Sequence, residues 1–146
     1  MIRVLLDANV YISYLLTRGA TGTIAQLISA AVEGLYVLLL PEEILQEISE
    51  AMQRKKALVG RIKPEELQVL TSSLLNIAEE IEPIREKVPA VSRDPKDTYL
   101  LAYAVVGQAD YLVTGDRDLL VLDPVGSLRI ISPADFLSVL SEQSSP

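Results

Sequence analysis

The chain has 146 residues, of which 49% are hydrophobic and 23% charged, and this composition indicates one globular domain rather than a disordered segment. It has no cysteine and no histidine, which excludes disulfides, thiol nucleophiles, histidine bases and zinc sites built from those residues. The net charge of -7 argues against a protein that coats nucleic acid non-specifically, while a local patch can still bind it.

Signals for membrane targeting are missing from the sequence. No segment combines a charged start, an apolar run and a small-residue cleavage site, and the longest apolar runs are too short to span a bilayer. We therefore expect a cytoplasmic protein with no membrane partner.

The first part of the chain alternates short apolar runs with helical patterns. Residues 2–6 and 36–40 lack helical periodicity, which is typical of strands buried on both faces. Helices are expected over 8–16 and 23–33, and the first of them begins directly after Asp7. An acidic residue between a strand and a helix is therefore predicted at the carboxyl edge of a sheet.

The next predicted helix, over 41–54, carries glutamates beside its apolar stripe, namely Glu43, Glu47 and Glu50. Most glutamates on such a helix are solvated surface residues. Glu47 differs because it lies between Ile44 and Ile48, at the boundary of the buried stripe.

Basic residues are concentrated between positions 54 and 63, where no acidic residue occurs; they are Arg54, Lys55, Lys56, Arg61 and Lys63. Lys55, Lys56 and Arg61 are candidates for contacts with an RNA backbone. A solvated helix end with a cationic last turn explains the segment at least as well.

The rest of the chain continues the alternation. We expect a helix over 64–80 with Leu67, Leu70, Leu74, Leu75 and Ile77 facing inward, a short edge strand over 81–84, a loop over 86–92, a helix that Asp94 begins, strands over 111–114 and 128–131, and a helix over 133–140. Residues 1–140 are predicted to be a single domain and residues 141–146 a flexible tail. Alternating strands and helices predict an α/β fold, a three-layer α/β/α sandwich with a central parallel sheet.

Acidic residues occur where these strands end and where one helix begins. Capping explains part of the pattern, because Asp94 before Pro95 is a typical N-cap and Asp116 and Asp118 suit a turn. Parallel strands, however, share one carboxyl edge, where ligands bind in open α/β sheets. Clustered carboxylates there would repel one another without a cation, and oxygen-only ligation favours Mg²⁺ or Mn²⁺.

Five short stretches, in this order along the chain, read LLDANV (5–10), EEILQEI (42–48), RDPKD (93–97), YLVTGDRDLL (111–120) and IISPADF (130–136). Each stretch is weak evidence alone, but their order and their spread over almost the whole chain are specific. Together they resemble the PIN domain family of metal-dependent ribonucleases, and most closely its VapC-like members, the toxins of VapBC-type toxin–antitoxin pairs.

The resemblance implies an α/β/α fold and assigns the catalytic carboxylates as Asp7, Glu47, Asp97 and Asp116. These residues, with Asp94 as a fifth ligand, would hold one or two Mg²⁺ or Mn²⁺ ions that activate a water for in-line attack on an RNA phosphodiester. The polar residues implied to support the site are Asn9, Thr114 and Asp118. Asp118 competes with Asp116 for the turn position, and Asp116 is favoured because it follows the strand more closely. The family also implies a homodimer and a small antitoxin that docks over the acidic cleft.

Two other functions stay open. A magnesium-dependent phosphatase also places an aspartate after its first strand, but it usually needs a second acid nearby, where this chain has Ala8 and Asn9. A non-catalytic PIN-like scaffold would only bind a partner, and the presence of all four acids argues against it. Assays of RNA cleavage, phosphate release and metal binding separate the three functions.

Overall fold

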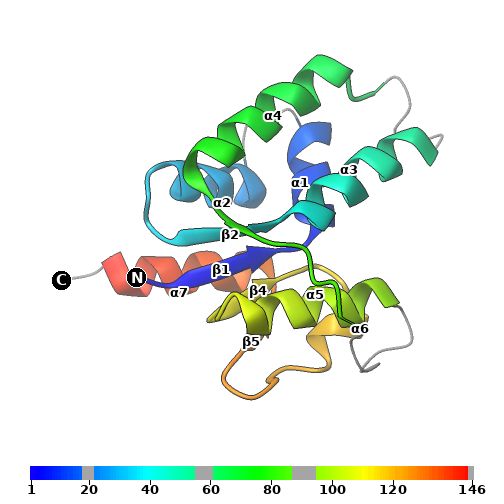
Figure 1. Ribbon diagram of the computed structural model, residues 1–146. Helices are drawn as coiled ribbons and strands as arrows, with labels where there is room; N and C mark the ends of the chain where they lie inside the picture. Colours follow the sequence, from blue (N-terminus) through cyan, green and yellow to red (C-terminus); the bar gives the residue numbers. More distant parts are fainter. Residues whose placement is uncertain (18–21, 55–60, 87–94, 145–146) are drawn as a thin grey trace.

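The computed structural model describes residues 1–17, 22–54, 61–86 and 95–144, and structural statements below concern this part of the chain (Figure 1). Its strands are β1 (Arg3–Leu6), β2 (Val37–Pro41), β3 (Glu79–Ile81), β4 (Tyr111–Val113) and β5 (Arg129–Ile131). Its helices are α1 (Ala8–Leu16), α2 (Thr23–Val32), α3 (Glu42–Arg54), α4 (Pro64–Ile77), α5 (Pro95–Val106), α6 (Arg117–Leu120) and α7 (Pro133–Ser144). The predicted three-layer α/β fold with a central parallel sheet is confirmed.

The five strands form one parallel sheet in the order β3-β2-β1-β4-β5, with β1 at its centre. Leu5 of β1 pairs with Leu39 of β2, and Leu6 pairs with Val113 of β4. The chain moves outward from β1 to β3 and then returns to the other side of β1 to form β4 and β5. The strand order therefore reverses between β1 and β4, which is the place where parallel sheets open a crevice for ligands.

Helices cover the sheet and close its core. In the view of Figure 1, α1 to α4 lie above β1, and α5 and α6 lie below it. Helix α1 packs on α2 and α3, and α2 packs on α7. Phe136 of α7 is fully buried against two tyrosine rings, with its ring centre 5.2 Å from that of Tyr36 and 5.7 Å from that of Tyr111. None of the helices in the described ranges has the length and apolar character needed to cross a bilayer.

The carboxyl end of α5 approaches the sheet closely at Gly107. A Cβ atom at this position would lie 2.7 Å from Ile81 Cδ1 and 3.1 Å from Leu39 Cδ1, so only glycine fits without displacing its neighbours. The Arg3 guanidinium donates hydrogen bonds of 3.0 and 2.8 Å to the Gly107 carbonyl and forms an ion pair with Glu79. Strand β1 thereby fixes the end of α5.

Several element boundaries differ from the sequence predictions. Helix α4 ends at Ile77 because Ala78 is extended and the chain then pairs with β2 as β3, so the strand predicted over 81–84 begins earlier. Leu75 and Ile77, predicted to face inward, are 43% and 37% exposed. Helix α7 continues to Ser144, past the predicted end at Leu140, because no glycine or proline interrupts it. The predicted loop over 86–92 lies, apart from Glu86, outside the described residues.

Candidate active site at the carboxyl edge of the sheet

Asp7 lies at the carboxyl end of the central strand, between β1 and α1. Its backbone N–H donates to the Val113 carbonyl at 3.0 Å, which extends the β1–β4 ladder by one step. Its side chain is only 7% exposed and caps α1, with Oδ1 accepting a hydrogen bond of 3.3 Å from the Asn9 N–H. Asp7 therefore caps a helix and also lies beside the point where the strand order reverses.

Thr114 connects the ends of β1 and β4. It is fully buried, and its hydroxyl donates a hydrogen bond of 2.8 Å to Asp7 Oδ2. The Thr114 hydroxyl oxygen also accepts a hydrogen bond of 3.0 Å from the Asp116 N–H. One hydroxyl thus fixes both the Asp7 carboxylate and the backbone of the turn that carries Asp116.

Asp116 is the N-cap of the short helix α6, which the sequence analysis described only as a turn. Its Oδ1 accepts the Asp118 N–H at 2.9 Å, whereas the Asp118 side chain is exposed. Burial raises the pKa of Asp7 above its ordinary value, the hydrogen bonds from Thr114 and Asn9 lower it, and the Asp116 charge raises it. The two carboxylates therefore repel one another, and a cation between them would relieve the repulsion.

Glu47 lies on α3 and Asp97 in the first turn of α5, and both are partly buried. Asp94 lies outside the described residues. Among the residues that the structure describes, no three acidic, cysteine or histidine side chains are grouped closely enough to hold a metal ion. The convergence of Asp7, Glu47, Asp97 and Asp116 on one ion therefore stays a prediction.

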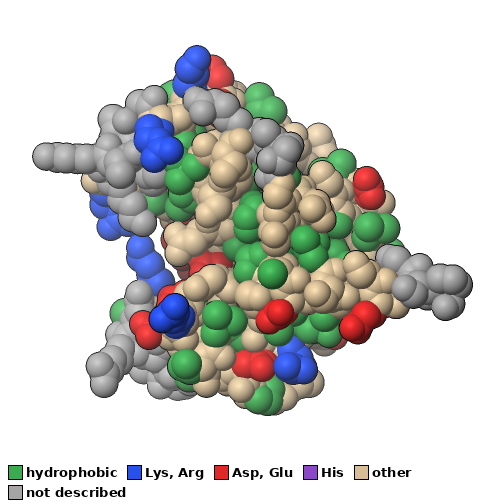
Figure 2. Space-filling model, turned by 180° about the vertical axis from the view of Figure 1, so that it is seen from behind, with side chains coloured by type: hydrophobic (Ala, Val, Ile, Leu, Met, Phe, Trp, Pro, Cys, Tyr) green, Lys and Arg blue, Asp and Glu red, His purple; other side chains and the backbone are tan. Residues whose placement is uncertain are grey.

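The surface around this edge combines both signs of charge. Figure 2, which shows the molecule from behind, has acidic side chains in a hollow and Lys and Arg side chains along its margin. Lys55 and Lys56 lie outside the described residues, and Arg61 is exposed beside the buried Ile62. Arg54 is held by Glu50, one turn earlier on α3, at 3.5 Å. The RNA contacts proposed for Lys55, Lys56 and Arg61 stay a prediction.

Tyr103 and Glu43, neither of which was predicted as a site residue, form a partly buried contact between α5 and α3. The Tyr103 hydroxyl donates a hydrogen bond of 2.6 Å to Glu43 Oε1 and accepts the Ile84 N–H at 3.0 Å. Glu43 had been grouped with the solvated glutamates of its helix. A tyrosine within the apolar pattern of α5 is a signal that its hydroxyl needs a partner, but the sequence does not identify that partner.

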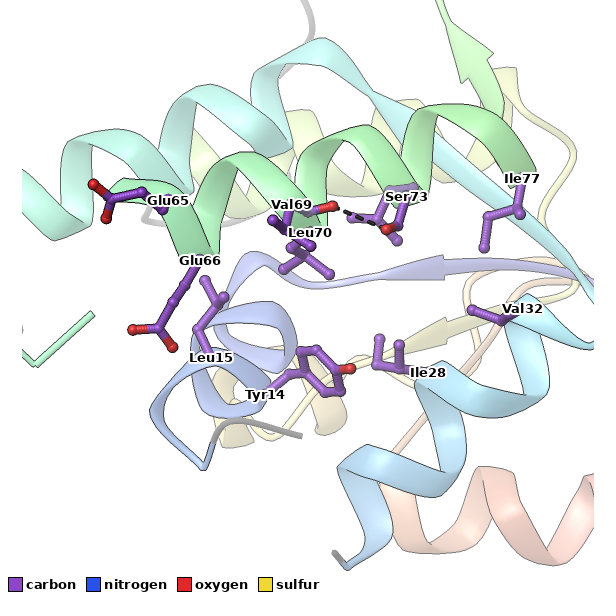
Figure 3. Close-up of a pocket in the computed structure, with 11 residues that line it drawn as sticks. Tyr14, Leu15, Ile28, Val32, Glu65, Glu66, Val69, Leu70, Ser73 and Ile77 are labelled. Carbon is purple, nitrogen blue, oxygen red and sulfur yellow. Dashed lines mark hydrogen bonds between the residues drawn. The ribbon is translucent and has the colours of Figure 1, made fainter. Parts of the chain in front are cut away.

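An apolar groove of about 440 Å³ lies between α4 and the first two helices (Figure 3). Figure 3 shows Val69 and Ile77 of α4 facing Ile28 and Val32 of α2, and Glu65 and Glu66 lie at one end of the groove. None of the four predicted catalytic acids lines it. The groove and the acidic edge are therefore separate features.

Residues 3–118 match a family model described as PIN domain, whereas no curated protein matches the chain. The matched range runs from β1 into α6 and contains Asp7, Glu47, Asp97 and Asp116. PIN domains are generally nucleases and typically use divalent metal ions. Because the match spans most of its length and agrees with the observed fold, the chain belongs to the PIN domain family.

Proposed function

We propose that this protein is a metal-dependent endoribonuclease that hydrolyses RNA phosphodiester bonds with Mg²⁺ or Mn²⁺. The observation that carries the proposal is the pair of carboxylates at the reversal of strand order, where Thr114 links buried Asp7 to the turn of Asp116. Family membership supports nuclease chemistry in general. The choice of RNA, and of these residues as ligands, is what the proposal adds.

The chemistry of the available donors suits a hard divalent cation. Asp7 uses each carboxylate oxygen for one hydrogen bond, and an ionised carboxylate keeps further lone pairs for an ion. Glu47, Asp97 and Asp94 would complete an all-oxygen set, which is the preference of Mg²⁺ and Mn²⁺. When bound, such ions activate a water molecule and offset the charge of the phosphodiester.

The roles of the protein groups follow from their positions. Thr114 holds the Asp7 carboxylate in one orientation. The Asn9 N–H donates to Asp7, and the Asp118 N–H donates to Asp116. The chain has no histidine, the commonest side-chain base at neutral pH, so a bound divalent ion would supply the activation of water. In this proposal Lys55, Lys56 and Arg61 bind the RNA backbone.

The proposal extends to partners. We expect a homodimer that acts as the toxin of a toxin–antitoxin pair, with a small antitoxin over the acidic cleft. The net charge of -7 favours a partner with a basic docking segment. Residues 1–140 would form the single nuclease domain.

The test replaces one acid of the turn at a time. Asp116→Asn should abolish RNA cleavage in Mn²⁺, while the matched change Asp118→Asn, at an exposed side chain in the same turn, should retain most of it. EDTA should stop the wild type. Manganese should also raise the melting temperature of the wild type, by the stabilisation expected for a ligand of the native state, and raise that of Asp116→Asn much less.

Three results would contradict the proposal. Cleavage that survives exhaustive chelation would remove the metal mechanism. Equal activity losses in Asp116→Asn and Asp118→Asn would refute the assignment of Asp116 as the metal ligand of this turn. Release of phosphate from a monoester without RNA cleavage would favour the phosphatase, and metal-independent binding without cleavage would favour the scaffold.

A further inference from the structure

Tyr103 ties together three segments that lie far apart in the sequence. It belongs to α5, is only 2% exposed, and hydrogen-bonds through one hydroxyl to Glu43 of α3 and to the backbone of Ile84, which follows β3. Burial, together with the neighbouring Glu43 carboxylate, raises the pKa of Tyr103 to about 12. The hydroxyl therefore keeps its proton at neutral pH and remains a donor to Glu43.

The two helices joined in this way carry two of the predicted metal ligands. Glu43 and Glu47 are four residues apart on α3, so they lie on the same face, one turn from each other. Asp97 lies six residues before Tyr103 on α5, about 9 Å along the helix axis. A contact between Glu43 and Tyr103 thus restrains α3 one turn from Glu47 and also restrains α5, the helix that carries Asp97.

The carboxyl end of α5, one turn beyond Tyr103, has a second anchor. Arg3 of β1 donates to the Gly107 carbonyl, and the close approach of Gly107 to β2 and β3 fixes that end against the sheet. An anchor at one end of a helix leaves the rotation and tilt of that helix to other contacts. The Tyr103 hydroxyl supplies such a contact, directed toward α3.

We propose that Tyr103 is a positioning residue which, by its hydrogen bond to Glu43, sets the placement of α3 against α5 and thereby of Glu47 relative to Asp97. This inference rests on the proposed metal site. Metal sites demand ligand placement within about 0.5 Å, and polar partners outside the ligand set commonly affect metal affinity by about 10- to 100-fold. Neither Tyr103 nor Glu43 needs to contact the ion for this role.

The experiment measures Mn²⁺ affinity by isothermal titration calorimetry for the wild type and three variants. Tyr103→Phe removes the hydroxyl and keeps the ring, and it should weaken Mn²⁺ binding about tenfold. Glu43→Gln keeps an amide oxygen that accepts the same hydrogen bond, so its affinity should stay within about threefold of the wild type. Amide hydrogen exchange at Ile84, in metal-free protein, should accelerate in Tyr103→Phe alone.

Tyr36→Phe is the matched control for a general loss of stability. Tyr36 is also 2% exposed, and its hydroxyl donates a hydrogen bond of 2.8 Å to the Leu27 carbonyl, in a part of the core away from the predicted ligands. Loss of the Tyr36 hydroxyl should lower the melting temperature, as loss of the Tyr103 hydroxyl does. It should leave the Mn²⁺ affinity unchanged.

Each contrary outcome has a distinct meaning. An Mn²⁺ affinity that is unchanged in Tyr103→Phe, or weakened equally in Tyr36→Phe, overturns the positioning role and leaves the proposed function intact. Loss of Mn²⁺ binding in Glu43→Gln without an effect in Tyr103→Phe would make Glu43 itself a ligand and also overturn it. A wild-type protein that binds no Mn²⁺ overturns the proposed metal site and the positioning role together.

Discussion

Replacement of Thr114 by valine tests the link between Asp7 and Asp116 while preserving the shape of the side chain. Thr114 is fully buried, and its hydroxyl makes one hydrogen bond to the Asp7 carboxylate and one to the Asp116 N–H. A hydrogen bond to a charged group contributes about 1.5–3 kcal/mol and one between neutral groups about 1 kcal/mol. Thr114→Val should therefore lower the free energy of unfolding by about 2.5–4 kcal/mol at pH 7.

The effect should depend on pH through Asp7. Burial raises the pKa of Asp7 in the folded protein, so between the unfolded and folded pKa values the native state binds more protons. Stability from this group accordingly falls as pH rises through that window. The Thr114 hydrogen bond lowers the Asp7 pKa in the folded protein, so loss of this bond raises that pKa further and extends the pH range of falling stability upward. The loss of unfolding free energy in Thr114→Val should thus be larger at pH 7 than at pH 4, because Asp7 binds more protons at the lower pH.

The assay is urea denaturation in EDTA at both pH values, with Thr114→Ser as the control. Serine retains the hydroxyl and loses one methyl group, which should cost about 1 kcal/mol and show little dependence on pH. A Thr114→Val variant as stable as the wild type would refute the reasoning. So would a deficit that is the same at both pH values, or one that Thr114→Ser reproduces.

Two further predictions follow from other residues. Within the described residues the fully buried Tyr11 hydroxyl has no hydrogen-bond partner. Tyr11→Phe should therefore leave the free energy of unfolding unchanged or raise it by about 1–2 kcal/mol in thermal denaturation. A loss of that size would reveal an ordered partner such as a buried water. Neutralising Lys55, Lys56 and Arg61 together should weaken RNA binding and flatten its dependence on salt concentration, because fewer counterions are released. If the dependence of RNA affinity on salt concentration is unchanged in a binding titration, this segment is a solvated helix end and does not contact RNA.

The sequence alone determined the strands and much of the acidic edge. Short apolar runs without helical periodicity located β1, β2 and β4, because a strand covered by helices on both faces must be apolar on both. Asp7 and Asp116 could be placed at strand ends for the same reason: each is the first acidic residue after such a run. Element ends were less certain, as β3 and α7 show, since pairing with β2 and the lack of a helix breaker decide them.

The tertiary structure decided how these residues meet. Thr114 donates a hydrogen bond to Asp7 across a sequence separation of 107 residues, and Tyr103 donates one to Glu43 across 60 residues. Local pattern carries no information about such pairs, because they depend on the strand order and on how closely Gly107 lets α5 approach the sheet. The sequence could class Glu43 only as one more glutamate on an amphipathic helix. The buried Tyr103 on the facing helix, whose hydroxyl donates to Glu43, gives that glutamate a specific place in the structure.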